Sequence, residues 1–197
     1  MTYVYFLVLF IYLATGFIDN LTISLTLKFL IGFISLFYFR EYYKFKMKFD
    51  FFAIFIGLLV AFVWIFGLKF YDFFNLSILT NMQINFSMID LILKFITFTI
   101  FTPVIEEFFM RFWLIRFIIS KDWKKVEIGK FTFSSFLFTT LFFGFSHTLW
   151  IQGIVAGILF NLVYYYRKNI ESCILAHFVS NFFLAVVVLL NGNIILW

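Results

Sequence analysis

The chain has little of what the surface of a water-soluble domain requires. Only 13% of its 197 residues are charged, where about 25% is usual, and 64% are hydrophobic. One cysteine excludes an intramolecular disulfide framework, and the single proline, Pro103, lies inside an apolar segment. The mean hydropathy is +1.07. These shortages exclude a soluble class and predict one compact all-α domain, a polytopic transmembrane helical bundle.

Apolar runs long enough to cross a bilayer recur along the chain, and we expect about seven spans. The runs cover residues 3–18, 21–39, 51–71, 91–119, 131–149, 151–166 and 172–190. The fourth run is long for one crossing of about 30 Å, so we expect it to be tilted, kinked at Pro103 or extended into the cytosol. The first run begins almost at Met1 without a charged region before it, which predicts a retained span rather than a cleaved signal peptide.

The basic residues are unevenly distributed, and their distribution predicts a topology. Ten of the fifteen lie in the second, fourth and sixth loops, whereas the first, third and fifth loops carry none. These ten are Arg40, Lys44, Lys46, Lys48, Lys121, Lys124, Lys125, Lys130, Arg167 and Lys168. By the positive-inside rule, the even-numbered loops and the N-terminus are cytoplasmic. The net charge of +5 therefore indicates orientation rather than an acidic partner such as nucleic acid. The small size and the 36 phenylalanines favour a bacterial plasma membrane.

Three charged residues interrupt the fourth apolar run. Each charge at the bilayer centre costs roughly 2.5–3.5 kcal/mol, and crossing a membrane requires none of them, so we expect a buried site. Glu107 and Arg111 are four residues apart and can pair on one helix face, while Glu106 points roughly 100° away. An ion pair that braces the bundle would explain Glu107 and Arg111 but not Glu106. We therefore favour a catalytic site in which Glu106 acts as a base.

Both histidines of the chain lie within later apolar runs. His147 follows Phe143 by four residues, and His177 precedes Asn181 by four residues, so that its imidazole and the amide share a helix face. A lone histidine on an apolar helix is often only a packing residue. Two histidines within spans, taken together with the carboxylates of the fourth run, predict one shared site near the middle of the membrane.

The ordered pattern Glu-Glu-x-x-x-Arg, Phe-x-x-x-His and His-x-x-x-Asn resembles the CPBP family, which comprises the CAAX proteases and the bacteriocin-processing enzymes also called Abi proteins. In this chain the three motifs are Glu106-Glu107…Arg111, Phe143…His147 and His177…Asn181. They occur in separate predicted helices. The resemblance covers about residues 91–190, which we take as a catalytic helical core, and residues 1–90 form the N-terminal transmembrane helices.

The resemblance implies an intramembrane endopeptidase that hydrolyses a peptide bond. By position, Glu106 would activate the attacking water with help from His147, and His177 and Asn181 would stabilise the oxyanion. The adjacent glutamate–arginine pair would orient the site. The expected partner is a membrane-associated protein or peptide precursor, and the surrounding medium is the lipid bilayer.

Two mechanisms stay open for such an enzyme. Glu106, His147 and His177 supply the carboxylate and imidazoles of a zinc site with an open position. However, the chain has no His-Glu-x-x-His helix, and Asn181 suits an oxyanion better than a zinc ion. We therefore favour a metal-independent glutamate mechanism without a cofactor.

Two other functions use the same residues. One is a non-catalytic membrane protein, such as a bacteriocin-immunity or scaffold protein, and the other is a proton-coupled transporter with these side chains as a relay. The intact motif set argues against the first, and the lack of visible inverted repeats argues against the second. Gly153 and Gly157 predict close helix packing within one chain rather than dimerisation. Cys173 has no adjacent base in the sequence and is not expected to be a nucleophile.

Overall fold

The computed structural model describes residues 3–40, 49–73 and 86–191, and the side chains of all of these except 68–73. Every regular element in these ranges is helical, which confirms the all-α fold class. Seven helical rods follow one another: α1 (Val4–Ala14, with a 3₁₀ turn Thr15–Phe17), α2 (Leu21–Phe39), α3 (Phe51–Phe73), a composite rod Met88–Ile119, α7 (Phe133–Phe145), α8 (Trp150–Arg167) and α9 (Ile170–Asn191).

Three of these rods are long and apolar enough to cross a membrane, namely Leu21–Phe39, Met88–Ile119 and Ile170–Asn191. Shorter apolar helices cover Val4–Phe17, Phe51–Gly67 and Phe133–Phe145. The rods match the seven predicted apolar runs in number and order, but the number that span the bilayer stays a prediction.

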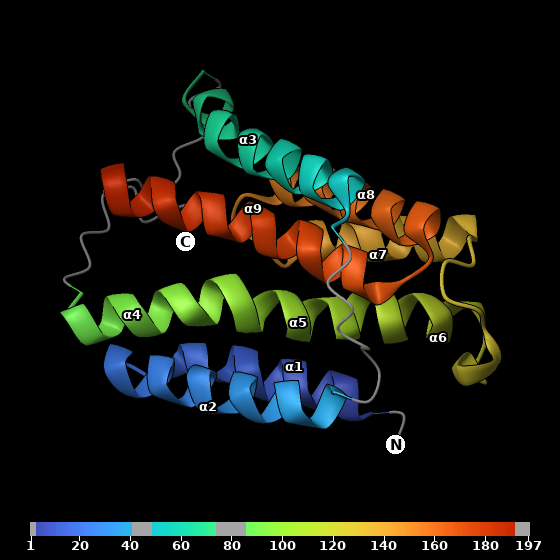
Figure 1. Ribbon diagram of the computed structural model, residues 1–197, viewed down its shortest axis with the longest axis horizontal. Helices are drawn as coiled ribbons and strands as arrows, with labels where there is room; N and C mark the ends of the chain where they lie inside the picture. Colours follow the sequence, from blue (N-terminus) through green and yellow to red (C-terminus); the bar gives the residue numbers. More distant parts are fainter. Residues whose placement is uncertain (1–2, 41–48, 74–85, 192–197) are drawn as a thin grey trace.

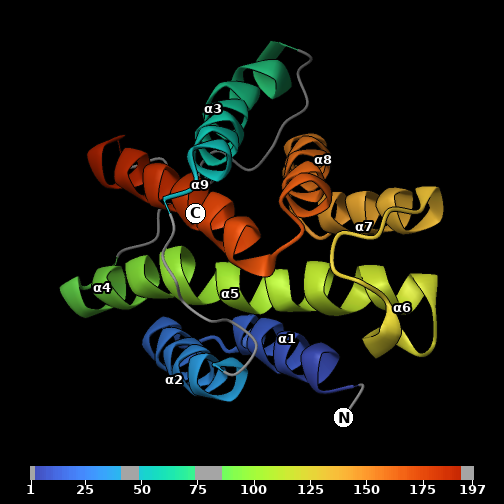
Figure 2. The ribbon, with the colours of Figure 1, turned by 45° about the vertical axis from the view of Figure 1, so that its right-hand side comes forward.

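The composite rod lies across the middle of the bundle (Figure 1). α1 and α2 pack along one side of it, and α3, α7, α8 and α9 lie on the other side in both ribbon views (Figures 1 and 2). Extensive contacts join α3 to α9 and α7 to α8. The rod therefore carries its residues into the interior between the two groups of helices.

Two π-helical segments interrupt the rod and flank its centre. The rod consists of α4 (Met88–Ile96), the π-helical segment Thr97–Phe101, α5 (Thr102–Glu107), a second π-helical segment Phe108–Leu114, and α6 (Ile115–Ile119). Pro103 stands in the first turn of α5, where its missing N–H is tolerated next to a π turn. Figure 1 shows the rod continuing from α4 through α5 to α6 without a sharp kink. The helix therefore accommodates Pro103 by changing locally from α-helical to π-helical hydrogen bonding.

The loops that were predicted to be cytoplasmic lie at one end of the bundle. In Figure 1 the N-terminus, the end of α2, the α6–α7 loop and the α8–α9 turn are all at the right, and the opposite connections are at the left. Lys44, Lys46 and Lys48 lie outside the described residues. Successive connections therefore lie at alternate ends of the bundle, as the distribution of basic residues predicts. Which end faces the cytoplasm stays a prediction.

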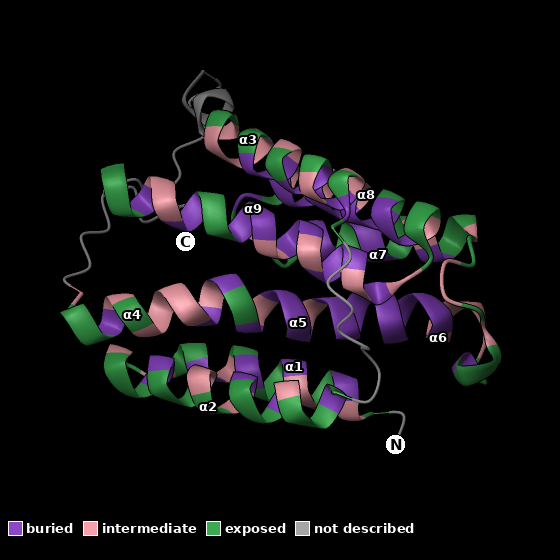
Figure 3. Ribbon diagram, in the orientation of Figure 1, coloured by how far each residue is buried: buried purple, intermediate pink, exposed green. Residues whose placement is uncertain are grey.

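Large apolar side chains cover the outer surface of the bundle. Figure 3 shows exposed residues along the outer faces of α1 and α2, and Phe33, Ile34 and Phe37 are examples on α2. Contiguous apolar surface of this extent is unfavourable in water but matches the hydrocarbon core of a bilayer. Together with the three long apolar helices, it describes an integral membrane protein.

Asp50 joins three helices at the basic end of the bundle. Its carboxylate accepts a hydrogen bond from the backbone N–H of Ala53 and so caps α3. It also accepts from Nε of Arg167, at 2.7 Å, and from the hydroxyl of Ser172 in the first turn of α9. Partial burial raises the pKa of Asp50, but these hydrogen bonds and the charge of Arg167 outweigh burial and hold the pKa below its ordinary value.

Asp50→Asn is expected to lower the melting temperature in detergent at neutral pH by a few degrees, because the charge opposite Arg167 is lost. The folded-state pKa of Asp50 lies below the unfolded-state value of about 3.9, so its stabilisation is present above that value and is lost as the pH falls through the folded-state pKa. The difference in melting temperature between the parent protein and Asp50→Asn should therefore become smaller at acid pH. Thermal unfolding recorded between neutral pH and about pH 3 measures it.

The exposed ion pair between Asp122 and Lys125 provides the control. Asp122→Asn should change the melting temperature little at any pH, because exposed pairs contribute little. Equal losses in the Asp50 and Asp122 variants would contradict the role given to Asp50.

Candidate active site

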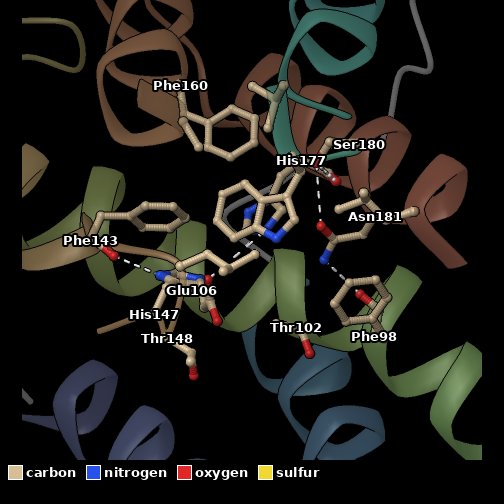
Figure 4. A pocket seen from close by; sticks show the side chains of 15 residues that line it. Phe98, Thr102, Glu106, Phe143, His147, Thr148, Phe160, His177, Ser180 and Asn181 are labelled. Atoms are coloured by element: carbon tan, nitrogen blue, oxygen red, sulfur yellow. Dashed lines mark hydrogen bonds and ion pairs between the residues drawn. The ribbon is translucent and has the colours of Figure 1, made fainter. Parts of the chain in front are cut away.

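Four of the six candidate residues line one cavity of about 190 Å³. Glu106 comes from α5, His147 from the turn after α7, and His177 and Asn181 from α9 (Figure 4). Most of the remaining wall is apolar. The structure therefore brings together polar side chains that are up to 75 residues apart in the sequence, from Glu106 to Asn181.

Glu107 and Arg111 are fully buried and do not line the cavity. Nη1 of Arg111 donates to Oε1 of Glu107 at 3.0 Å, on the shared helix face expected from their spacing. The same oxygen lies 2.9 Å from Nδ1 of His177. Glu106 is partly exposed to the cavity, with its Oε2 atom 3.9 Å from Nε2 of His177. His177 thus lies between the two glutamates, with one ring nitrogen facing each carboxylate.

The hydrogen bonds of His147 define its tautomer. Its Nδ1 atom lies 2.6 Å from the carbonyl oxygen of Phe143, which can only accept, so Nδ1 carries the proton. In the neutral ring Nε2 is then unprotonated and can accept a hydrogen bond from water. The ring also lies 5.5 Å from the indole of Trp64 in an edge-to-face arrangement. His147 therefore presents a base to the cavity from a fixed ring.

Asn181 owes its orientation to the proline of the rod. Thr102 donates its N–H to the carbonyl of Thr97, five residues earlier, and the next residue, Pro103, has no N–H to offer to the carbonyl of Phe98. Nδ2 of Asn181 donates to that carbonyl at 2.9 Å. One hydrogen of the amide is used in this way. The other hydrogen remains for a ligand, because an amide nitrogen has two.

The sequence placed His147 inside a helix that ends at residue 149, and the structure corrects this boundary. α7 ends at Phe145, and His147 stands in the turn before α8. The hydroxyl of Ser146 donates to the carbonyl of Phe143, and the His147 ring bonds to the same oxygen. Polar side chains that bond to the backbone in this way compete with the next helical turn. The turn lets His147 reach the cavity from the helix end.

Glycines hold this turn in place. A Cβ atom on Gly153 would lie 2.9 Å from the carbonyl oxygen of Gly144, and one on Gly144 would lie 2.3 Å from the side chain of Ile154. A Cβ atom on Gly157 would lie 3.1 Å from the carbonyl oxygen of Thr140. The prediction of close packing within one chain is therefore confirmed, and it fixes α8 against the end of α7.

Four further residues of the site had little signal in the sequence. Tyr12 of α1 is buried, and its hydroxyl lies 2.7 Å from that of Thr102, a cavity residue. Trp64 of α3 lines the cavity, and Asn161 of α8 bonds to Arg111. Aromatic and threonine side chains are too common in apolar helices to stand out. Asn161 could have been found, because a buried amide in an apolar span requires partners.

In the part of the chain that the structure describes, no three His, Cys, Asp or Glu side chains gather closely enough to hold a metal ion. The three residues of the predicted zinc alternative all reach the cavity, but not as such a group. Cys173 is fully buried, and its Sγ atom lies 3.5 Å from the carbonyl of Asn169. It is not among the residues that line the cavity.

Gly153→Leu is expected to destabilise the protein by about 1–3 kcal/mol, because the new side chain overlaps the backbone of α7. The melting temperature in detergent should fall by roughly 2–4 °C for each kcal/mol. Gly16→Leu is the matched control, since a Cβ atom at Gly16 meets only the end of Lys28, at 4.0 Å. Equal melting temperatures for Gly153→Leu and the parent protein would contradict the close packing.

Comparison with known proteins gives one match. Residues 88–183 match the model of the family described as type II CAAX prenyl endopeptidase Rce1-like. The matched segment begins at the first residue of the composite rod and contains all six candidate residues. The resemblance seen in the sequence motifs is thereby confirmed. No curated protein and no solved structure matches the chain.

Proposed function

We propose, from the match of residues 88–183 to the Rce1-like CAAX prenyl endopeptidase family, that the protein is a glutamate-type intramembrane endopeptidase. One observation supports the proposal most directly. A carboxylate, two imidazoles and an amide from three separate segments surround one cavity inside a largely apolar bundle. Hydrolysis of an amide in such a medium requires a local water molecule, a base, and donors for the oxyanion.

In the proposed mechanism, Glu106 is the general base. A water molecule in the cavity is bound by Glu106 and by the unprotonated Nε2 of His147, both of which face the cavity. As the water oxygen attacks the substrate carbonyl carbon, its proton passes to Glu106. The same carboxyl group then gives that proton to the leaving nitrogen when the carbon–nitrogen bond breaks. Glu106 thus ends each cycle ionised.

His177 and Asn181 stabilise the oxyanion of the tetrahedral intermediate. Asn181 offers its second amide hydrogen. His177 donates from Nε2 when both of its nitrogens are protonated, and the carboxylate of Glu107 on Nδ1 stabilises that imidazolium. Arg111 holds the Glu107 carboxylate in place from the other side. Removal of one oxyanion donor typically costs about 10²–10³-fold in turnover.

The substrate is a membrane-associated protein or peptide precursor. The apolar cavity wall, to which α3 contributes Val60 and Trp64, suits a chain that arrives from the bilayer. The protein functions in a bacterial plasma membrane with its N-terminus in the cytosol, in accordance with the positions of the basic loops. No resident metal takes part in the proposed reaction.

Glu106→Gln should lower cleavage by about 10²–10⁴-fold, because glutamine cannot accept the proton of the attacking water. The measurement is cleavage of fluorogenic CAAX peptides, farnesylated and unmodified, by the purified full chain in liposomes. A strong chelator should have no effect on the parent protein. Glu127→Gln, in an exposed loop, is the matched control and should cleave normally.

Three outcomes would contradict parts of this proposal. Full cleavage by Glu106→Gln would exclude this residue as the base. Loss of cleavage with chelator, restored by zinc, would replace the metal-independent mechanism. Proton-dependent solute uptake by liposomes that show no cleavage would identify a transporter instead of a protease.

A further inference from the structure

Arg111 is the largest of the fully buried side chains and needs partners that fix its plane. Its guanidinium carbon lies 4.9 Å from the ring centre of Phe143 and 5.5 Å from that of Phe160, and these two rings are perpendicular to each other. The aromatic rings attract the cation but do not select an orientation for its N–H groups. Nη2 has no hydrogen-bond partner among the described residues. The in-plane orientation is therefore determined by what Nε and Nη1 bind.

Nη1 binds Glu107, and Nε binds Asn161, whose Oδ1 atom lies 3.2 Å away. Asn161 is fully buried on α8, a helix that carries none of the six candidate residues. Asn161 is thus the second residue, after Glu107, that holds the guanidinium by a hydrogen bond. With Nε held there, Nη1 points at the same Glu107 oxygen that faces His177.

The amide of Asn161 is itself held in one orientation. Its nitrogen donates to the hydroxyls of Thr139 and Thr140 on α7, at 3.0 and 3.1 Å. Both of its hydrogens are thus used, and only the carbonyl oxygen is left to face Arg111. A flipped amide would set a donor against the guanidinium and lose the contact with Thr139, whose hydroxyl already donates to the carbonyl of Ser135. The acceptor therefore has no alternative orientation of similar energy.

We propose that Asn161 is a positioning residue for the reaction: through Arg111 and Glu107 it holds Nδ1 of His177 on the Glu107 carboxylate, so that Nε2, the oxyanion donor of the proposed mechanism, is directed at the cavity. The inference rests on the proposed function, because His177 is the residue that it serves. α8 acts on His177 in a second way as well, since the ring of Phe160 stacks on the imidazole at 4.7 Å. The histidine of α9 thus takes its orientation from α7 and α8.

A residue that merely packs α8 against the rod would affect stability alone. A positioning residue also affects the proton distribution of His177 and the turnover number. The chain has only two histidines, so nuclear magnetic resonance of protein with ¹⁵N- and ¹³C-labelled histidine gives two imidazoles, and His147→Gln assigns them. This measurement reports the protonation of each ring nitrogen without any substrate.

Asn161→Leu keeps the branched shape and the number of heavy atoms of the side chain and removes the acceptor. We expect the His177 signals to shift from the Nδ1-protonated pattern while those of His147 stay unchanged. kcat should fall about 10–100-fold with KM changed less than about twofold, as is typical when the outer partner of a functional histidine is removed. Asn191→Leu, the same substitution at the exposed end of α9, is the control and should show neither effect.

Asn161→Asp covers the case in which the leucine variant does not fold. It keeps an acceptor for Nε of Arg111 and adds a carboxylate that competes with Glu107 for the guanidinium. The His177 signals and the pH profile of kcat should both shift in this variant. Unchanged His177 signals in a folded variant would overturn the inference, even if Glu106→Gln abolishes cleavage. If the Asn161 variants shift the His177 signals but the parent protein cleaves no substrate, the proposed function is overturned. Asn161 would then orient His177 without a role in catalysis.

Discussion

One carboxylate oxygen organises the interior of this protein. Oε1 of Glu107 accepts hydrogen bonds from Arg111 on its own helix and from His177 on α9, and both the carboxylate and the guanidinium are fully buried. A buried charge that loses a partner is strongly destabilising, so the two helices have one favourable register relative to each other. Apolar surfaces between the rod and α9 could slide past each other at little cost. The shared oxygen removes that freedom, and the cavity exists in the one register that remains.

The same physical argument explains why the site was largely predictable from the sequence. Charged and imidazole side chains are expensive inside a membrane, so Glu106, Glu107 and Arg111 could be singled out without any structure. The helices were predictable because long apolar runs and short basic loops alternate. Hydrogen bonding of the backbone was not predictable. The π-helical segments of the rod and the turn around His147 depend on which carbonyl each donor reaches, and composition does not determine that choice.

The family match begins at Met88, yet the cavity is not built from the matched segment alone. Trp64 of α3 lies against His147, and Tyr12 of α1 bonds to Thr102 at the start of α5. The N-terminal helices therefore complete the wall and support the central rod, in addition to contributing lipid-facing surface. Their aromatic residues carried no signal in the sequence because 26% of the chain is aromatic. Their positions follow from packing between segments far apart in the chain.

The π-helical segment before α5 acts in geometry like one residue inserted into an α-helix. If the rod lost that extra residue, every side chain after it would take the place of its predecessor, a rotation of roughly 100°. Glu107 would then stand where Glu106 stands now, so a carboxylate would still face the cavity. Phe108 and Phe112 would take the places of Glu107 and Arg111, and the buried network would have neither its carboxylate nor its cation. A one-residue slip of the helix would thus keep a carboxylate at the cavity but remove the buried pair of Glu107 and Arg111 that fixes the rod against α9.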